Sequence, residues 1–207
     1  MAYEDFSIEK IESEFSITIA SQPHLFGPVE LIAPSERLVS LLEEFIPLGS
    51  SIGTEKARSE FIIAPILAEV KKLTGNKVSL FSGNRFDVDK EKGLTGYCDF
   101  IFSLSTIQLT ISAPVITIVE AKNENINSGF GQCMAEMIAA HIYNSIRKKP
   151  IDIIYGCVTT GSIWRFLKLE DNTISLDSTE YYLDQLPKIL GIFIASLNQT
   201  ARSLDEA

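Results

Sequence analysis

A short apolar run that ends in charged residues constrains the fold of this chain more than any other feature. Residues 114–119, with the sequence Pro-Val-Ile-Thr-Ile-Val, lead directly into Glu120, Ala121 and Lys122. An uninterrupted run of β-branched residues is typical of a strand buried on both faces, and the charges mark the point where it leaves the core. Because residues i and i+2 of a strand point to the same face, Glu120 and Lys122 are predicted to lie side by side.

The remaining apolar patterns predict a mixed α/β fold. Helices are predicted over residues 35–46, 54–73, 129–147 and 183–197, and strands over residues 77–81, 97–102, 115–119, 151–159, 163–169 and 173–181. Pro47 is expected to end the first of these helices, and Pro65 to kink or break the second. Residues 1–20 show no single pattern, although residues 15–19 alternate like a short edge strand. The order of helix, three strands, helix and strand predicts a mixed sheet with helices on both faces.

Length and composition place these elements in one domain. The chain has 207 residues, of which 45% are apolar and 22% charged, and this suits a single hydrophobic core. We expect one domain over residues 1–207, with a core over about 54–170, an N-terminal extension over 1–53 and a C-terminal strand and helix over 171–207. No apolar stretch approaches the roughly 18 residues of a membrane span, and the first residues lack a signal-peptide pattern. A cytoplasmic protein without membrane contact is therefore expected.

The charge of the chain limits how it binds nucleic acid. Its formal net charge is −9, which argues against a broad electrostatic grip on phosphates. Local basic clusters remain at Lys71-Lys72, at Arg85 and over residues 147–149, although lysines near a helix end also suit the helix dipole. The three cysteines are widely spaced, and no two of them form a CxxC motif. They fit neither a disulfide framework nor a zinc site, and we expect them to be buried.

The Glu-x-Lys triplet is weak evidence by itself, because about one copy is expected in a chain of this length. A second copy, Glu69-Val70-Lys71, lies on a predicted helix, where residues i and i+2 diverge by roughly 200° and cannot share a site. Only the copy at Glu120 lies on a predicted strand. Placement, and not the triplet itself, therefore distinguishes Glu120 and Lys122 as candidates.

Further carboxylates are expected to meet this strand end. Asp99 interrupts the aromatic run of residues 97–102, where a buried acid is costly unless a partner or a metal compensates its charge. Glu60 lies near the apolar stripe of the second predicted helix, and Glu55, about one turn away, competes for the same role. Acids and a lysine at a strand end suit a hard divalent cation and an activated water. A simpler interpretation stays open, in which Asp99 only pairs with Lys122 at the end of a buried strand.

These residues, in this order, resemble the PD-(D/E)XK nuclease superfamily. The family's first-helix acid, second-strand aspartate, third-strand E-x-K and following helix are matched by Glu60, Asp99, Glu120-Ala121-Lys122 and the helix carrying Gln132. Residues 58–67 resemble the first helix of the nuclease domain in type I restriction enzyme R subunits. Residues 158–167 resemble the T-x-G-x-x-W-x-F hairpin of that group. The likeness covers roughly residues 54–170.

The resemblance implies a restriction endonuclease-like αβββαβ core, with a mixed central sheet flanked by helices and an extra C-terminal β-hairpin and helix. It also implies a metal-dependent mechanism. Asp99, Glu120 and the carbonyl of Ala121 would hold Mg²⁺ or Mn²⁺. Glu60 would reach the metal through water or bind a second ion.

The same resemblance assigns roles to two more residues. Lys122 would orient the attacking water and stabilise the negative charge of the transition state. Gln132 is similar to a glutamine that some members place beside the active centre, although a solvated position at the start of its helix fits it equally well. Two departures are visible. Cys98 stands where the family motif has proline, and no P-loop G-x-x-x-x-G-K-[ST] is present, so no translocating motor is expected.

The sequence therefore predicts a metal-dependent phosphodiesterase that cleaves DNA in preference to RNA. A homodimer is compatible with this function, since many enzymes of the fold dimerise to cut both strands. Two alternatives stay open: a catalytically inactive module of the same fold that binds nucleic acid or a protein partner, and a purely structural acidic cluster. Trp164 and Phe166 alternate on a predicted strand and could stack on bases, but core packing is the preferred interpretation.

Overall fold

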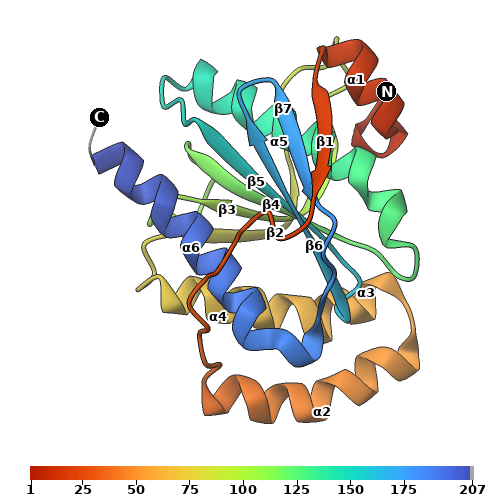
Figure 1. The fold of residues 1–207 in the computed structure, drawn as a ribbon, viewed down its shortest axis with the longest axis vertical. Coiled ribbons are helices and arrows are strands. Elements are labelled where there is room, and N and C mark those ends of the chain that lie inside the picture. Colours follow the sequence, from red (N-terminus) through yellow and green to blue (C-terminus); the bar gives the residue numbers. More distant parts are fainter. Residues whose placement is uncertain (206–207) are drawn as a thin grey trace.

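The computed structural model describes residues 1–205, in which one mixed sheet is covered by helices (Figure 1). Its strands are β1 (Thr18–Gln22), β2 (Ser79–Arg85), β3 (Tyr97–Ser103), β4 (Val115–Ala121), β5 (Ile153–Thr159), β6 (Ile163–Glu170), β7 (Thr173–Asp177) and β8 (Tyr181–Tyr182). Its α-helices are α1 (Ile8–Phe15), α2 (Glu36–Ile52), α3 (Glu55–Arg58), α4 (Ala64–Leu73), α5 (Phe130–Ile146) and α6 (Leu186–Asp205). No helix within residues 1–205 is both long and apolar enough to cross a membrane.

The sheet is mixed, as the sequence predicts. Its strand order is β1-β7-β6-β5-β4-β3-β2, and β8 pairs with β6. The β4–β5 and β1–β7 pairs are parallel, whereas the other neighbouring strands are antiparallel. Every residue of β4 is buried. This burial explains its continuous apolar sequence, because helices cover the strand on both faces.

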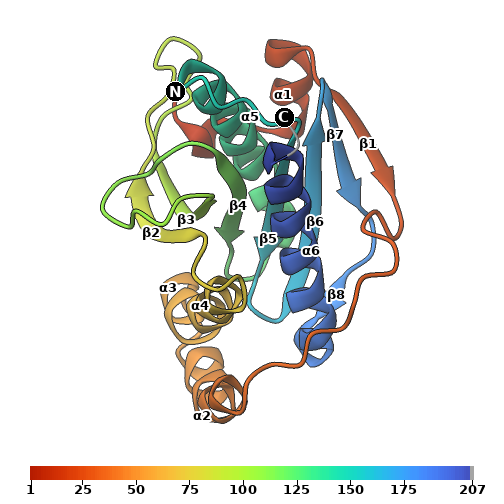
Figure 2. The ribbon, with the colours of Figure 1, turned by 90° about the vertical axis from the view of Figure 1, so that its left-hand side faces the viewer.

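Two neighbouring residues of β5 show that α5 and α6 lie on opposite faces of the sheet. Gly156 faces α5 so closely that an added Cβ would clash with the sulfur of Met137. The hydroxyl of Tyr155 instead donates a hydrogen bond to Gln199 of α6 at 3.0 Å. Successive residues of a strand point to opposite faces, so the two helices sandwich the sheet. α4 contacts α6 and β2, the edge strand on its side of the sheet (Figure 2).

Pro47 does not end the first long helix, so this expectation is wrong. α2 continues to Ile52 and ends at Gly53, whose φ of 70° is left-handed. Pro47 is exposed, which lets the helix tolerate the missing hydrogen bond on its outer side. Beyond it, Gly49 packs closely against Ile62. Tertiary packing therefore outweighs the local cost of the proline.

Near Pro65 the regular α-helical bonding is interrupted locally, as expected, but the helix continues from Glu55 to Leu73. α3 is followed by a π-helical turn over Ser59–Ile63 and then by α4. Because Pro65 has no N–H, it cannot make the regular helical bond to the residue four positions back. The preceding N–H, of Ala64, donates instead to the carbonyl of Ser59 five residues back. The extra residue in this turn rotates the side chains before it relative to those after it.

The N-terminal residues contain a helix that the sequence pattern left unassigned. α1 begins after Ser7, whose hydroxyl accepts a hydrogen bond from the Lys10 N–H at 3.4 Å. The edge strand β1 follows three residues later than predicted and pairs with β7. Tyr3 is buried, and its hydroxyl donates to the Phe86 carbonyl at 2.6 Å. Buried residues of this extension and of α6 belong to the same hydrophobic core as the strands.

Replacing Asn144 by alanine is expected to destabilise the protein by about 2–6 kcal/mol. Asn144 of α5 is 1% exposed, accepts from the Val115 N–H at 2.7 Å and donates to the Val115 carbonyl at 2.8 Å. Alanine would leave two buried backbone groups at the start of β4 unpaired, each costing about 1–3 kcal/mol. Urea denaturation measures the loss, with Ser145→Ala as the matched exposed control. An unchanged midpoint for Asn144→Ala would contradict this account.

Candidate active site

The start of β3 and the end of the antiparallel strand β4 bring Asp99 and Glu120 together where these strands meet. The two strands are antiparallel, and Phe100 pairs with Val119. Asp99, one residue before Phe100, therefore lies beside the last residues of β4. Its Oδ2 accepts a hydrogen bond from the Ala121 N–H at 2.8 Å. The carboxylate satisfies a backbone donor at the point where the regular pairing of the strands ends.

Glu120 and Lys122 lie side by side, as their spacing predicts. Nζ of Lys122 is 2.5 Å from Oε1 of Glu120, whose side chain is 1% exposed. The Lys122 N–H donates to the Thr159 carbonyl at 2.8 Å, which extends the pairing with β5 beyond the end of β4. Oε2 of Glu120 has no hydrogen-bond partner. Few buried carboxylate oxygens in proteins lack one, so this atom requires an explanation.

Burial dominates the electrostatics of this cluster. Burial, together with the nearby Glu136 and Asp99, raises the pKa of Glu120 well above its usual range despite the adjacent Lys122. Burial also raises the pKa of Asp99, although the hydrogen bond from Ala121 opposes it. For Lys122, burial favours the neutral amine, but the carboxylate of Glu120 outweighs it and the pKa is raised. The cluster holds more carboxylates than one lysine can neutralise, so an added cation would relieve their repulsion.

Sequence reasoning missed one acid of this cluster, Glu136, which is fully buried on α5. Nε2 of Gln132 donates to Oε1 of Glu136 at 3.2 Å, and Nζ of Lys122 donates to Oε1 of Gln132 at 3.3 Å. Gln132 is half-buried, and its two hydrogen bonds join Lys122 to Glu136. Burial raises the pKa of Glu136 to about 8. The available signal was helical spacing, since Glu136 follows Gln132 by four residues on one face, but the surrounding apolar residues suggested a purely structural stripe.

The two helix acids at the rim of this site, Glu55 and Glu60, interact with different lysines. A cavity of about 240 Å³ beside the strand ends is lined by Glu55, Lys56, Ser59, Glu60, Ser82, Gly83, Asp99 and Ala121. The side chain of Glu60 is 54% exposed and pairs with Lys56 at 3.0 Å. Glu55 is close enough to Lys122 to contribute to its raised pKa, after the larger effects of burial and of Glu120. Both acids reach the cavity, but Glu55 is the one that acts on the lysine.

The oxygen atoms of the site suit a hard cation, although they are not gathered as a complete ligand set. Within residues 1–205, no three His, Cys, Asp or Glu side chains form a metal-binding group. Lys122 binds one oxygen of Glu120, and the Ala121 N–H binds one oxygen of Asp99. The second oxygen of Glu120 has no hydrogen-bond partner within residues 1–205. Mg²⁺ usually takes only one or two carboxylates and keeps several waters. The side chains are therefore of the kind that Mg²⁺ takes as ligands, although no complete ligand set is formed within residues 1–205.

Other residues singled out from the sequence lie away from the strand ends. Trp164 and Phe166 are 0% and 3% exposed, which confirms that both pack in the core. All three cysteines are free and buried, as expected. Arg147 follows the end of α5, roughly 22 Å along the helix from Gln132. Lys71 lies near the end of α4 and donates to Gln108 at 3.0 Å. Neither of these two basic clusters lines the site.

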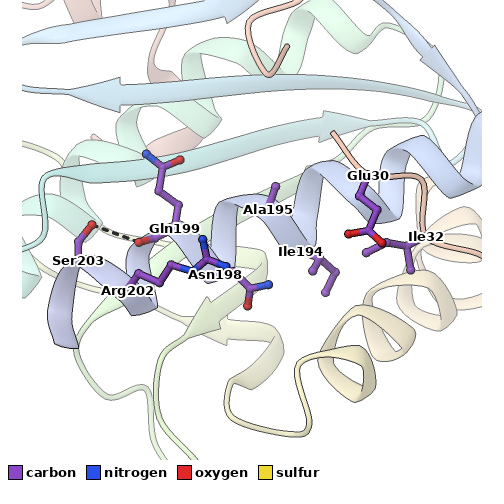
Figure 3. Close-up of a pocket in the computed structure, with 9 residues that line it drawn as sticks. Glu30, Ile32, Ile194, Ala195, Asn198, Gln199, Arg202 and Ser203 are labelled. Carbon is purple, nitrogen blue, oxygen red and sulfur yellow. Dashed lines mark hydrogen bonds between the residues drawn. The ribbon is translucent and has the colours of Figure 1, made fainter. Parts of the chain in front are cut away.

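A second cavity, of about 580 Å³, lies between α6 and the segment before α2 (Figure 3). Its charged side chains are Glu30 and Arg202, which lie toward opposite ends of the cavity in Figure 3. The hydroxyl of Ser203 bonds the Gln199 carbonyl at 3.1 Å. Among the residues that line the cavity, Glu30, Arg202 and Ser203 are not held together as an acid, a base and a nucleophile by any hydrogen bond or ion pair between them. The strand ends of β3 and β4 are therefore the better candidate for chemistry.

No protein-family model matches the chain, and no curated protein is significantly similar to it. The comparisons therefore identify no family for this chain, and the resemblance noted in the sequence stays a prediction that rests on a few residues. They are the strand-borne Asp99, Glu120 and Lys122, together with the contacts just described.

Proposed function

We propose that this protein is a metal-dependent nuclease with a restriction endonuclease-like core, which hydrolyses phosphodiester bonds of DNA in preference to RNA. The observation that carries the proposal is the convergence of Asp99, the buried carboxylate of Glu120 and the ammonium of Lys122 at the ends of two neighbouring strands, where one oxygen of Glu120 has no hydrogen-bond partner within residues 1–205. Buried carboxylate oxygens usually have a hydrogen-bond partner, and here Oε2 of Glu136 lacks one as well as Oε2 of Glu120. A bare oxygen suits a site that receives a cation.

The element order supports the restriction endonuclease-like part of the proposal. α4 is followed by the antiparallel strands β2, β3 and β4, then by α5 and by β5, which is parallel to β4. This is the αβββαβ order that the motifs imply. β6 and β7 then form a hairpin, and α6 closes the fold on the face opposite α5.

In this proposal Asp99, Glu120 and the carbonyl of Ala121 hold Mg²⁺ or Mn²⁺, and Glu55 or Glu60 acts from the rim through water. When bound, the cation supplies a positive charge for the phosphate and lowers the pKa of a nearby water. Glu120 has one oxygen for each task, because Oε1 holds Lys122 while Oε2 is free. The lysine and the cation can therefore be bound at the same time.

Lys122 stabilises the negative charge that develops on the phosphate and orients the attacking water. Its ammonium donates hydrogen bonds to both Glu120 and Gln132, and Gln132 in turn donates to Glu136. A charged group held in place before the reaction needs no reorganisation in the transition state. Such a group is typically worth about 3–4 kcal/mol.

The test is to incubate the purified protein with supercoiled, linear and single-stranded DNA and with RNA, in Mg²⁺, Mn²⁺ or EDTA. We expect metal-dependent cleavage that Asp99→Ala and Lys122→Ala each abolish. Lys71→Ala is the matched control, because Lys71 belongs to the helical Glu-x-Lys triplet and its amine binds Gln108 instead. Cleavage that survives both site substitutions would contradict the assignment of the site.

The alternative functions predict different results in the same experiment. An inactive binding module would show neither cleavage nor Mg²⁺ or Mn²⁺ binding at millimolar concentration, whatever the substrate. A purely structural acidic cluster would be stabilised by Asp99→Asn in the absence of metal, since the substitution removes a buried charge. A denaturation midpoint that falls in this variant would count against that alternative.

Replacing Glu55 by glutamine is expected to lower the cleavage rate about tenfold, a loss of about 1.4 kcal/mol of transition-state stabilisation. Replacing Glu60 should lower the rate by less than about twofold, because Glu60 is largely exposed and pairs with Lys56. Initial rates over a Mg²⁺ titration measure both effects, and each variant serves as the control for the other. The reverse order of effects would assign the role of helix acid to Glu60.

A further inference from the structure

The last part of β2 and the first residue of β3 form an exposed strip beside the candidate site. The strip consists of Ser82, Gly83, Asn84 and Arg85 of β2 and Tyr97 of β3, and all five residues are exposed. β2 is the last strand of the sheet, so the strip lies at its open edge (Figure 2). An exposed sheet edge of this kind is available to an extended ligand.

Tyr97 is the main apolar surface of the strip. It is 63% exposed and pairs directly with Arg85 across the two strands. The guanidinium carbon of Arg85 lies 5.8 Å from the centre of the ring, and Asp87 holds the guanidinium in place at 2.8 Å. The arginine therefore covers part of the ring and orients it. The exposed remainder of the ring is a flat platform without a partner within residues 1–205.

The strip is continuous with the candidate site. Tyr97 precedes Asp99 by two residues in the same strand, a separation of roughly 7 Å. Ser82 and Gly83 line the same cavity as Asp99 and Ala121. A Cβ added at Gly83 would meet no atom within 4 Å, so the backbone there is open to a ligand. A chain bound at Asp99 would therefore pass directly over Tyr97.

We propose that this strip binds an unpaired nucleotide next to the cleaved phosphate, so that the substrate is single-stranded DNA or the unpaired segment of a branched or frayed end. The inference rests on the proposed nuclease function and specifies its substrate. The distance from Asp99 to Tyr97 corresponds to about one nucleotide of an extended nucleic acid strand. An exposed tyrosine at that distance offers a stacking surface for one base, worth about 1–3 kcal/mol.

The chemistry of the strip favours an unpaired base over an intact duplex. Bases of a duplex are stacked on each other and cannot lie on a protein ring unless they are extruded. The strip contains no carboxylate, and the adjacent Asp87 is already paired with Arg85. A mobile polyanion can therefore approach it even though the whole chain is acidic.

The test measures binding and cleavage separately. Binding of a labelled 12-nucleotide single strand, and of the same strand in a blunt duplex, is followed by fluorescence anisotropy in EDTA. Tyr97→Ala is expected to weaken single-strand binding about 5- to 100-fold, whereas Tyr97→Phe, which keeps the ring, should change it by less than about twofold. Tyr182→Ala is the matched control, because Tyr182 is a 48% exposed tyrosine on β8. The duplex should bind more weakly than the single strand and respond little to Tyr97→Ala.

Equal single-strand binding by Tyr97→Ala and the wild-type protein, or a preference for the blunt duplex, would overturn the inference. Cleavage in Mg²⁺ then separates this failure from that of the nuclease function. If the wild-type protein cleaves, Asp99→Ala does not, and Tyr97→Ala keeps the substrate preference, only the strip is wrong. If no variant cleaves but single-strand binding depends on Tyr97, the strip stands and the nuclease function fails. Thermal denaturation confirms that each variant is folded.

Discussion

Replacing Lys122 by methionine is expected to lower cleavage about 100- to 1,000-fold and, separately, to destabilise the protein by about 3–5 kcal/mol at pH 8. The second effect arises because Glu120 is 1% exposed and would lose the partner that neutralises it. Removing one member of a buried ion pair leaves an uncompensated charge, which costs more than the pair contributes. The stability loss should shrink at pH 5, where Glu120 can take up a proton. Initial rates and urea denaturation at both pH values measure the two effects.

A double variant separates the structural role of Lys122 from its chemical role. Glu120→Gln combined with Lys122→Met removes both charges, so stability should return to within about 1 kcal/mol of the wild-type protein. Cleavage should remain lost, since neither a ligand nor the ammonium is restored. Lys71→Met, at the helical triplet, should change neither property. Recovery of cleavage in the double variant would show that Lys122 only compensates the charge of Glu120.

Replacing Glu136 by glutamine is expected to stabilise the protein at pH 8 by about 1–3 kcal/mol and to flatten its pH dependence. Burial raises the pKa of Glu136 from 4.5 to about 8, so the folded state keeps a proton that the unfolded state has lost. Between these two values the folded state binds more protons, and stability therefore falls as the pH rises. Glutamine removes this titration and keeps an amide oxygen for the hydrogen bond from Gln132. Urea denaturation in EDTA from pH 5 to 8.5 gives the two curves.

A second substitution at the same position controls for the lost hydrogen bond. Glu136→Met also removes the titrating group, but it cannot accept the hydrogen bond from Gln132. Both variants should show the flattened pH dependence. Only methionine should also lower the cleavage rate, because Gln132 would then no longer be held toward Lys122. Parallel stability curves for the wild-type protein and Glu136→Gln would show that Glu136 does not titrate in this range.

Much of the fold follows from local patterns. The continuous apolar run of β4 predicts a strand covered on both faces, and all of its residues are buried. Pro65 interrupts the α-helical bonding locally because a missing N–H acts within one turn. Pro47 shows the limit of this reasoning. Packing of the residues that follow it keeps α2 intact, and that packing involves Ile62 from a later segment of the chain.

The same contrast between local sequence pattern and tertiary packing applies to the candidate site. Glu120 and Lys122 were predictable because two residues of one strand share a face whatever surrounds them. Glu136 was not, because a glutamate among apolar helix residues says nothing about which carboxylates it will meet. Glu60 pairs with Lys56, whereas Glu55 lies near Lys122, a distinction that spacing left open. The aromatic run of β3 likewise does not reveal that Tyr97 is exposed while Phe100 and Phe102 are buried.

The sequence by itself determined the buried strand, the adjacent acid and lysine at its end, and the order of elements that makes a mixed sheet. These features depend on alternation, helical period and proline chemistry, which act over a few residues. Only the tertiary structure decided which acids surround Lys122, which oxygen of Glu120 stays bare, and which aromatic ring is open beside the site. Those outcomes depend on how α5, the π-helical turn and the edge of β2 pack against the strand ends, and burial of this kind is a property of the assembled core.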